Sequence, residues 1–421
     1  MSQTIAIAIF LIVIIAIISE KVHRAAASVA GAVALMLFHI LDVESAVSYI
    51  DFNTIGVLVG MMLFVSVVKC SGLFEYIAIK SAKIAKGDPW KIMMMFVIVT
   101  AVLSAFLDNV TTVLLIGPMT ISITGILGLN PVPFLLTQIM ASNIGGTATL
   151  IGDPPNIMIG SSAGLSFMDF ILNTAPIVVV IMVVFILMIK MIYGRKMDVS
   201  QDAIEQVMLL DENKAIEDPI LLKKSIIMIA LVVLGFMLHS VIHVESCVVA
   251  LTAATVMLLI GKQDVENTIA EVEWTTIVFF TGLFVVVGGL VETGFIDKLA
   301  NLIISVSADK PIMTILILLI ASALLSCILD NIPFVATLIP LIIVMGENGV
   351  DIMPLWWAIS LGACLGGNGT IIGASANVVL TGISAKHGHP ISFNQFLKIG
   401  FPTMLVSVAI SAVYLVVRYG M

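Results

Sequence analysis

The stretch Gly145-Gly-Thr-Ala-Thr-Leu-Ile-Gly-Asp-Pro-Pro-Asn156 interrupts a long apolar run with glycines, prolines and an acid. It recurs as Gly366-Gly-Asn-Gly-Thr-Ile-Ile-Gly-Ala-Ser-Ala-Asn377. Each copy follows a shorter motif, Leu107-Asp-Asn109 in the first half and Leu329-Asp-Asn331 in the second. A carboxylate at bilayer depth costs about 2.5–3.5 kcal/mol on insertion scales, and interrupted helices leave backbone groups that lipid cannot satisfy. The duplication therefore predicts the ion and substrate site of a secondary transporter.

The composition indicates a membrane protein. Of the 421 residues, 60% are hydrophobic and 11% are charged, whereas a soluble globular protein carries about 25% charged residues. We therefore expect an all-α integral membrane protein, whose length is best counted in spans of about 20 residues. The expected partners are the lipid bilayer and a small ion or anion, with no nucleic acid. We expect no enzyme activity, and no cofactor apart from Na⁺ or H⁺ as a coupling ion.

The two halves of the chain align with each other. Asp330 lies 222 residues after Asp108, and the second glycine-rich stretch begins 221 residues after the first. We therefore expect a first repeat at 1–195, a cytoplasmic linker at 196–221 and a second repeat at 222–421.

Each repeat is expected to contain five transmembrane helices and one re-entrant hairpin. The hairpins fall at about 91–128 and 311–346, where Asp-Asn joins two apolar runs, and the broken helices at about 131–163 and 353–384. A charged turn cannot lie in lipid but can form the tip of a hairpin that protein surrounds. Because an odd number of crossings inverts the second repeat, the tips and breaks of both repeats are expected to meet near the membrane midplane.

The positive charges predict the orientation. If the N-terminus is outside, only Lys298, Lys310 and Arg418 of the 19 Lys and Arg residues lie outside, and the others are cytoplasmic. Cytoplasmic loops carry such an excess of Lys and Arg. We therefore expect a multi-pass protein of the cell (plasma) membrane with both termini outside.

The tips and breaks supply oxygen ligands. No Lys or Arg occurs between Lys91 and Lys190 or between Lys310 and Lys386, so the hairpins and broken helices contain no cation of their own. Carboxylates, carbonyls and hydroxyls suit Na⁺, or a proton on a carboxylate, while helix N-termini favour an anion. The candidate ion and substrate ligands are Asp108, Asn109, Thr111, Thr112, Asn143, Gly145, Gly146, Thr147, Thr149, Asp153, Asn156, Asp330, Asn331, Gly366, Gly367, Asn368, Thr370 and Asn377. The Na⁺ candidates among them are Asp108, Asn109, Thr147, Asp330 and Asn331.

The two halves differ chemically at this site. Asp153-Pro-Pro155 aligns with Ala374-Ser-Ala376, and Thr111-Thr112 aligns with Pro333-Phe334. The first site has an extra carboxylate and two extra hydroxyls, which predicts tighter binding of the coupling cation. The prolines are expected to keep the carbonyls of the first break unpaired and available.

Two motifs also indicate a family. Phe106-Leu-Asp-Asn-Val-Thr-Thr112 and the stretch 143–156 resemble the motifs of the pink-eyed-dilution (P) protein branch of the arsenite permease (ArsB)/NhaD group, within the ion transporter superfamily. The resemblance covers nearly the whole chain. It implies an elevator-type ion transporter fold, in which each protomer of a homodimer has a scaffold domain and a moving transport domain of hairpins and broken helices. Relatives in the dicarboxylate branch carry Ser-Asn-Thr at the tips, where this chain has Asp108-Asn109 and Asp330-Asn331.

We therefore expect a secondary active transporter, coupled to Na⁺ or H⁺, that moves a small anion or oxyacid such as arsenite or a carboxylate by an elevator mechanism. A Na⁺/H⁺ antiporter is one alternative. An anion channel of related fold is another, and would carry currents far above carrier turnover. An intramembrane aspartyl protease built on Asp108 and Asp330 is disfavoured, because both acids lie in equivalent tips and are followed by Asn.

Overall fold

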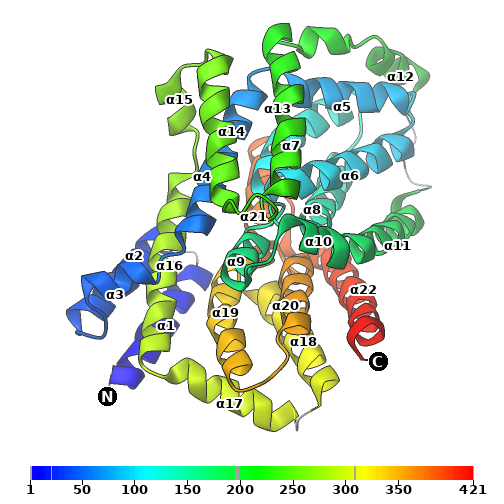
Figure 1. Ribbon diagram of the computed structural model, residues 1–421. Coiled ribbons are helices and arrows are strands. Elements are labelled where there is room, and N and C mark those ends of the chain that lie inside the picture. Colours follow the sequence, from blue (N-terminus) through cyan, green and yellow to red (C-terminus); the bar gives the residue numbers. More distant parts are fainter. Residues whose placement is uncertain (1, 20, 195–196, 198, 308–309, 421) are drawn as a thin grey trace.

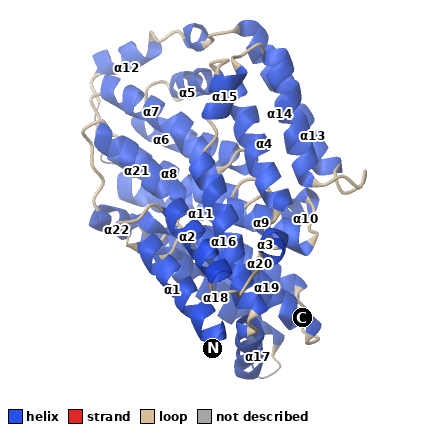
Figure 2. Ribbon diagram, turned by 90° about the vertical axis from the view of Figure 1, so that its left-hand side faces the viewer, coloured by secondary structure: helices blue, strands red, loops and turns tan. Residues whose placement is uncertain are grey.

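The structure is a computed structural model that describes residues 2–19, 21–194, 197, 199–307 and 310–420 (Figure 1). Throughout these residues the regular structure is helical, with no strand (Figure 2). Eight helices in this part of the chain are long and apolar enough to cross a membrane. The expectation of an all-α, multi-pass membrane protein is therefore confirmed. The expected boundary between the first repeat and the linker, at 195–196, lies outside the described residues.

Both halves contain the same order of helices up to the broken helix, after which the first half ends in two helices and the second in one. The first half forms α1 (Ser2–Ile18), α2 (Arg24–Leu37), α3 (Val43–Ser48), α4 (Phe52–Lys69), α5 (Leu73–Ile84), α6 (Pro89–Phe106), α7 (Asn109–Ile126), α8 (Val132–Gly146), α9 (Pro154–Ala163), α10 (Phe167–Asn173) and α11 (Ala175–Tyr193). The second half forms α13 (Pro219–Leu238), α14 (Ser246–Gly261), α15 (Val265–Ala270), α16 (Trp274–Glu292), α17 (Phe295–Ser307), α18 (Pro311–Ile328), α19 (Asn331–Glu347), α20 (Met353–Gly366), η2 (Ile371–Gly373), α21 (Ser375–Lys386) and α22 (Phe393–Tyr419).

The helices pack in matching pairs. In each half the first hairpin helix packs against the first arm of the broken helix, α6 against α8 and α18 against α20. Contacts between the halves also match, since α2 packs on α16 and α4 on α14, while α7 packs on α21 and α19 on α9. Figure 1 shows α5 at the upper end of the molecule and its counterpart α17 at the lower end. The hairpin tips and the breaks of both halves meet between these two ends.

Helix length does not separate hairpin helices from the others. The helices α6, α7 and α18 have 18 residues each and are among the eight that are long enough to span a membrane. In contrast, α2 has 14 residues, which corresponds to about 21 Å at 1.5 Å per residue. The apolar runs on either side of Asp108 form helices of 18 residues each, so the Asp-Asn tip, and not helix length, identifies the hairpin.

The Asp-Asn motifs break each hairpin by starting a new helix. After α6, Leu107 is extended and Asp108 is the N-cap of α7, with its carboxylate accepting from the Thr111 amide at 2.9 Å. After α18, Asp330 is the N-cap of α19 and accepts from the Ile332 amide at 3.3 Å. An aspartate at this position satisfies one of the free N–H groups of a helix start, which stabilises the turn by about 1 kcal/mol.

The linker between the halves packs on the protein. It contains α12 (Gln201–Met208) and η1 (Glu212–Ala215), and the fully buried Val207 of α12 joins an apolar cluster with Ala82 of α5. Glu212 binds Lys83 and also Lys80, the latter at 3.0 Å, and these charge-assisted hydrogen bonds, led by that of Lys83, lower its pKa to about 2. The linker is therefore not freely solvated over 201–215, because Val207 and Glu212 both have partners on α5.

Candidate functional site

Residues from both hairpin tips and both breaks line a common cavity. Asp108, Asn109, Asp153 and Asn331 line a largely enclosed cavity of about 20 Å³. Asp153 is fully buried and Asp108 is 7% exposed. A cavity of this size holds one or two water-sized particles. The structure therefore brings together four of the predicted site residues around a space that fits an ion.

The carboxylate of Asp153 lines the cavity and does not cap a helix. It stands at the N-cap position of α9, yet its side chain accepts no backbone N–H of that helix. Instead, the Asn331 amide donates to both carboxylate oxygens, at 3.2 and 3.4 Å. Because Asn331 belongs to the second hairpin, this pair connects the first break to the second tip.

Asp108 is held differently. Both the backbone N–H and the hydroxyl of Thr111 donate to its carboxylate. The hydroxyl of the neighbouring Thr112 is buried and has no hydrogen-bond partner among the described residues. A buried hydroxyl without a partner carries a desolvation penalty that a bound water or cation would relieve. Thr112 is nevertheless absent from the lining of the small cavity, and Thr111 supports Asp108.

Most of the other predicted ligands form a hydrogen-bonded core behind the cavity. Asn143 donates to Asn368 and to Asn377, both at 2.9 Å, and accepts from Asn109 at 3.4 Å. These buried amides join the first tip and the first broken helix to the second broken helix. Their role in this structure is to fix the geometry of the two breaks.

The carbonyls of the breaks already have partners. The Asn156 amide donates to the carbonyls of Thr149, Thr147 and Gly146, at 2.9, 3.3 and 3.4 Å. In the second break, Asn377 donates to the carbonyls at 367 and 370, at 2.7 and 2.9 Å. The expectation that the carbonyls of the first break are unpaired is therefore wrong for residues 146, 147 and 149, because Asn156 in the first turn of α9 donates to them.

The threonines and glycines of the breaks also have structural roles. The hydroxyls of Thr147 and Thr370 donate to the carbonyls of Asn143 and Cys327, at 2.7 and 2.5 Å, and that of Thr149 donates to the Ala105 carbonyl. A Cβ at Gly145 would lie 2.2 Å from the Ala101 carbonyl oxygen, and Cβ atoms at 146, 366 and 367 would also meet backbone atoms at 3.1 Å or less. Gly145 and Gly366 permit the close packing of α6 on α8 and of α18 on α20, and Gly146 and Gly367 permit the chain of each break to approach the end of its own helix.

The sequence analysis missed Arg24. Its guanidinium, at the start of α2, donates to Ser375 Oγ at 2.6 Å and forms an ion pair with Asp330 Oδ2 at 3.4 Å. It also donates to Thr276 Oγ1 at 3.0 Å. The hairpins contain no cation of their own, as expected, but one reaches the second tip from another helix. In sequence, Arg24 is indistinguishable from the loop cations that precede many membrane helices.

Glu273 was missed as well. It stands before α16, lines the small cavity with Asp108 and Asp153, and accepts from the Thr276 hydroxyl at 3.0 Å. The lining of the small cavity thus includes three carboxyl groups and one guanidinium, that of Arg24. Across the described residues, no group of three or more His, Cys, Asp or Glu side chains has a geometry that could hold a metal ion. A bound cation would therefore also need amide, hydroxyl or water oxygens.

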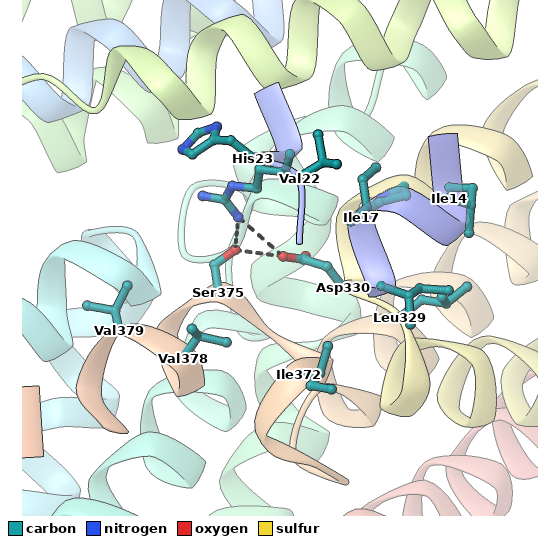
Figure 3. A pocket seen from close by; sticks show the side chains of 13 residues that line it. Ile14, Ile17, Val22, His23, Leu329, Asp330, Ile372, Ser375, Val378 and Val379 are labelled. Atoms are coloured by element: carbon teal, nitrogen blue, oxygen red, sulfur yellow. Dashed lines mark hydrogen bonds and ion pairs between the residues drawn. The ribbon is translucent and has the colours of Figure 1, made fainter. Parts of the chain in front are cut away.

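A second, larger pocket lies beside the small cavity. Its volume is about 270 Å³, and Figure 3 shows Asp330 and Ser375 at its polar end among aliphatic side chains. The aliphatic wall includes Ile14 and Ile17 of α1, and Val378 and Val379 of α21. Asp330 lines this pocket and not the small cavity, so the structure separates it from Asp108 and Asp153.

The chain is similar to known transporters in sequence. Residues 14–362 match the family model CitMHS, described as a citrate transporter. An uncharacterized transporter of Mycobacterium bovis is 42% identical over 425 residues, which cover 99% of both chains. The human P protein is 34% identical over 501 residues, covering 99% of this chain and 60% of the P protein. The predicted similarity to the P protein is therefore confirmed.

A solved structure supports the fold alone. The YdaH transporter of Alcanivorax borkumensis superposes with a TM-score of 0.61 at 16% sequence identity, covering 89% of this chain and 87% of that chain. At such low identity the likeness concerns the arrangement of the helices and not the substrate.

Proposed function

Because the chain belongs to the CitMHS citrate transporter family, we propose that this membrane transporter is a secondary active carrier that couples a small anion or oxyacid to Na⁺ or H⁺. One observation carries the coupling. Asp108, Asp153 and Glu273 surround the same small cavity with Arg24 as the one guanidinium in its lining. Buried carboxylates that lack a counter-charge are strongly unfavourable, so a site with this excess of acids requires bound cations or protons.

The size of the cavity limits what binds there. A space of about 20 Å³ accommodates an ion but not a molecule with several carboxyl groups. In the proposed cycle the organic anion or oxyacid therefore binds in the adjoining pocket of about 270 Å³ or in another conformation. The family description favours a carboxylate such as citrate as the substrate. The motif resemblance favours arsenite as a second candidate. We also propose that the chain is related to the ArsB/NhaD group.

A Na⁺/H⁺ antiporter is the second candidate. The same acid-rich cavity favours it, because an exchanger of two cations requires carboxylates and no anion site. The presence of Arg24 and of the larger pocket favours the first candidate, since both offer contacts to an anion with an apolar part. An anion channel does not account for the excess of carboxyl groups around an ion-sized space, and a protease built on Asp108 and Asp330 is disfavoured because these two acids line different spaces.

We also propose two inverted repeats and an elevator movement. The matched packing of α2 on α16 and α4 on α14 supports a scaffold, and the matched packing of α7 on α21 and α19 on α9 supports a separate transport domain. The resemblance to the ion transporter superfamily supports a homodimer, and the distribution of Lys and Arg supports a multi-pass protein of the plasma membrane with both termini outside. In this arrangement the linker lies on the cytoplasmic side.

Proteoliposome fluxes test the proposed function. We expect purified wild-type protein to move labelled citrate, succinate or arsenite only in the presence of a Na⁺ or H⁺ gradient, because the acids of the cavity must be neutralised before the site can move. Na⁺ flux that dissipates a pH gradient without any organic or oxyanion substrate would instead establish the antiporter. Anion currents that no cation affects would contradict both candidates.

Cysteine labelling tests the topology. Cysteines that replace Ser200 in the linker and Lys386 at the end of α21 should react with a membrane-impermeant reagent only from the cytoplasm, and one that replaces Lys310 before α18 only from outside. All three positions are exposed in the structure. Reaction of all three from one face would exclude the inverted arrangement, whatever the transported substrate.

A further inference from the structure

Two residues separate the larger pocket from the small cavity. Of the described residues, Arg24 and Ser375 alone line both spaces. They are joined by the hydrogen bond of 2.6 Å from the guanidinium to Ser375 Oγ. Figure 3 shows Ser375 and Asp330 at this junction, with dashed lines marking the contacts. The two spaces therefore adjoin at this hydrogen bond.

The guanidinium of Arg24 connects α2 and α16 to the starts of α19 and α21. On its own side, Arg24 of α2 is anchored to α16, where it donates to Thr276 and lies 5.3 Å from the ring centre of Phe279. On the other side it meets Asp330 and Ser375, the residues that precede α19 and begin α21. These are the helices that the proposed function assigns to the scaffold and to the transport domain, so the contact spans the proposed sliding interface.

Asp330 is already occupied. Its Oδ2 accepts from Ser375 Oγ at 2.7 Å and pairs with Arg24 at 3.4 Å, and its Oδ1 caps α19. A guanidinium is a permanent cation, so it neutralises this carboxylate in the same way that a bound ion would. The side chains of Arg24 and Asp330 are 28% and 12% exposed, so the pair is partly desolvated but accessible to exchange.

The first tip has no such cation. The position equivalent to Arg24, 222 residues later, is Ser246, whose hydroxyl donates to Asn53 at 3.2 Å. Asp108, which is equivalent to Asp330, binds Thr111 and faces the inner cavity. The two tips therefore differ in one respect that matters for ion binding, since only the second carries its own counter-ion.

We propose that Arg24 is a tethered cation that holds the second tip in place of the transported cation and closes the passage to the inner cavity. This inference rests on the proposed function. When Na⁺ or H⁺ enters through the larger pocket and binds Asp330 before it reaches the inner carboxylates, Asp330 no longer attracts the guanidinium. The bond to Ser375 is then released, and the transport domain is free to move relative to α2 and α16. Without the cation, Arg24 keeps the two sets of helices together, which prevents movement of the carrier with an unneutralised acid.

The proposal is tested by removing the tethered charge. In proteoliposomes that contain trapped Na⁺-sensitive or pH-sensitive dyes, Arg24→Gln should lower the half-saturating concentration of the coupling cation about fivefold, as expected for loss of a partly exposed ion pair. It should also allow cation flux in the absence of the co-transported substrate. Arg24→Lys, which keeps the charge, should retain most of the wild-type affinity, and Arg418→Gln, which removes an arginine bound to Tyr414 on α22, should change neither quantity.

Two further variants identify the partner. Ser375→Ala keeps all charges and removes the hydrogen bond at the passage, so it should raise the uncoupled flux even if Arg24→Gln does not fold. Adding Arg24→Gln to Asp330→Asn should give no gain in cation affinity over Asp330→Asn alone, because the acid for which Arg24 competes is absent. Wild-type protein without any cation-dependent flux would overturn the proposed function itself. Normal coupling in the wild type, with unchanged affinity and leak in Arg24→Gln and in Ser375→Ala, would overturn this inference alone.

Discussion

Asp153→Asn is expected to abolish cation-dependent transport while leaving membrane insertion intact. Asp153 is fully buried beside the small cavity, and its carboxylate is bound by the Asn331 amide and by no backbone N–H of α9. The charge is therefore available to a cation, and every 1.4 kcal/mol of lost cation binding weakens affinity about tenfold. Removal of the charge should ease insertion, because a carboxylate in a membrane helix costs about 2.5–3.5 kcal/mol. The transport rate should be measured against Na⁺ concentration and, separately, against pH.

Two other variants make this result interpretable. Asp202→Asn removes an exposed acid of the linker and should leave both curves unchanged. Ala374→Asp introduces a carboxyl group at the equivalent buried position of the second break, and should alter cation dependence less than the loss of Asp153 does. If Asp153→Asn leaves the Na⁺ and pH curves as in the wild type, Asp153 is a structural partner of Asn331 and the difference between the halves has no role in coupling.

Asn143→Asp is expected to destabilise the protein strongly. The Asn143 amide donates at 2.9 Å to the side-chain oxygens of both Asn368 and Asn377. An aspartate would replace this donor with a carboxylate oxygen that faces two other oxygens in a fully buried site. Each buried polar group left unsatisfied costs about 1–3 kcal/mol, and a buried charge costs more. We expect a large fall in the melting temperature of the detergent-solubilised protein, together with low expression.

Asn348→Asp is the matched control. Asn348 is exposed at the end of α19 and donates to the Val344 carbonyl at 2.8 Å. Asn348→Asp makes the same change of an amide to a carboxylate, but at a site exposed to solvent, so the melting temperature should change little. An Asn143→Asp protein that melts with the wild type would mean that the amide core does not hold the two broken helices together.

The sequence alone determined the features that depend on local chemistry. Apolar runs placed the helices because their length and composition suit a bilayer, and the Asp-Asn motifs placed the starts of α7 and α19 because an aspartate caps the helix that follows it. The repeated motifs identified Asp108, Asp153 and Asn331 as neighbours of an ion-sized cavity. The packed linker was not predictable, since a single Val207 within a polar stretch does not form a periodic pattern.

The tertiary structure decided which of these groups face the ion and which hold the frame. Arg24 reaches Asp330 across 306 positions of the chain, and Asn143 reaches Asn377 across 234. Such contacts depend on how the helices of the two halves pack, which no local pattern records. The Asn156 amide shows the same limit, because it satisfies the carbonyls of its own break only once the chain between 146 and 156 has folded back on itself. Local sequence specified the hydrogen-bond donors and acceptors, and the packing of the folded chain determined which donor meets which acceptor.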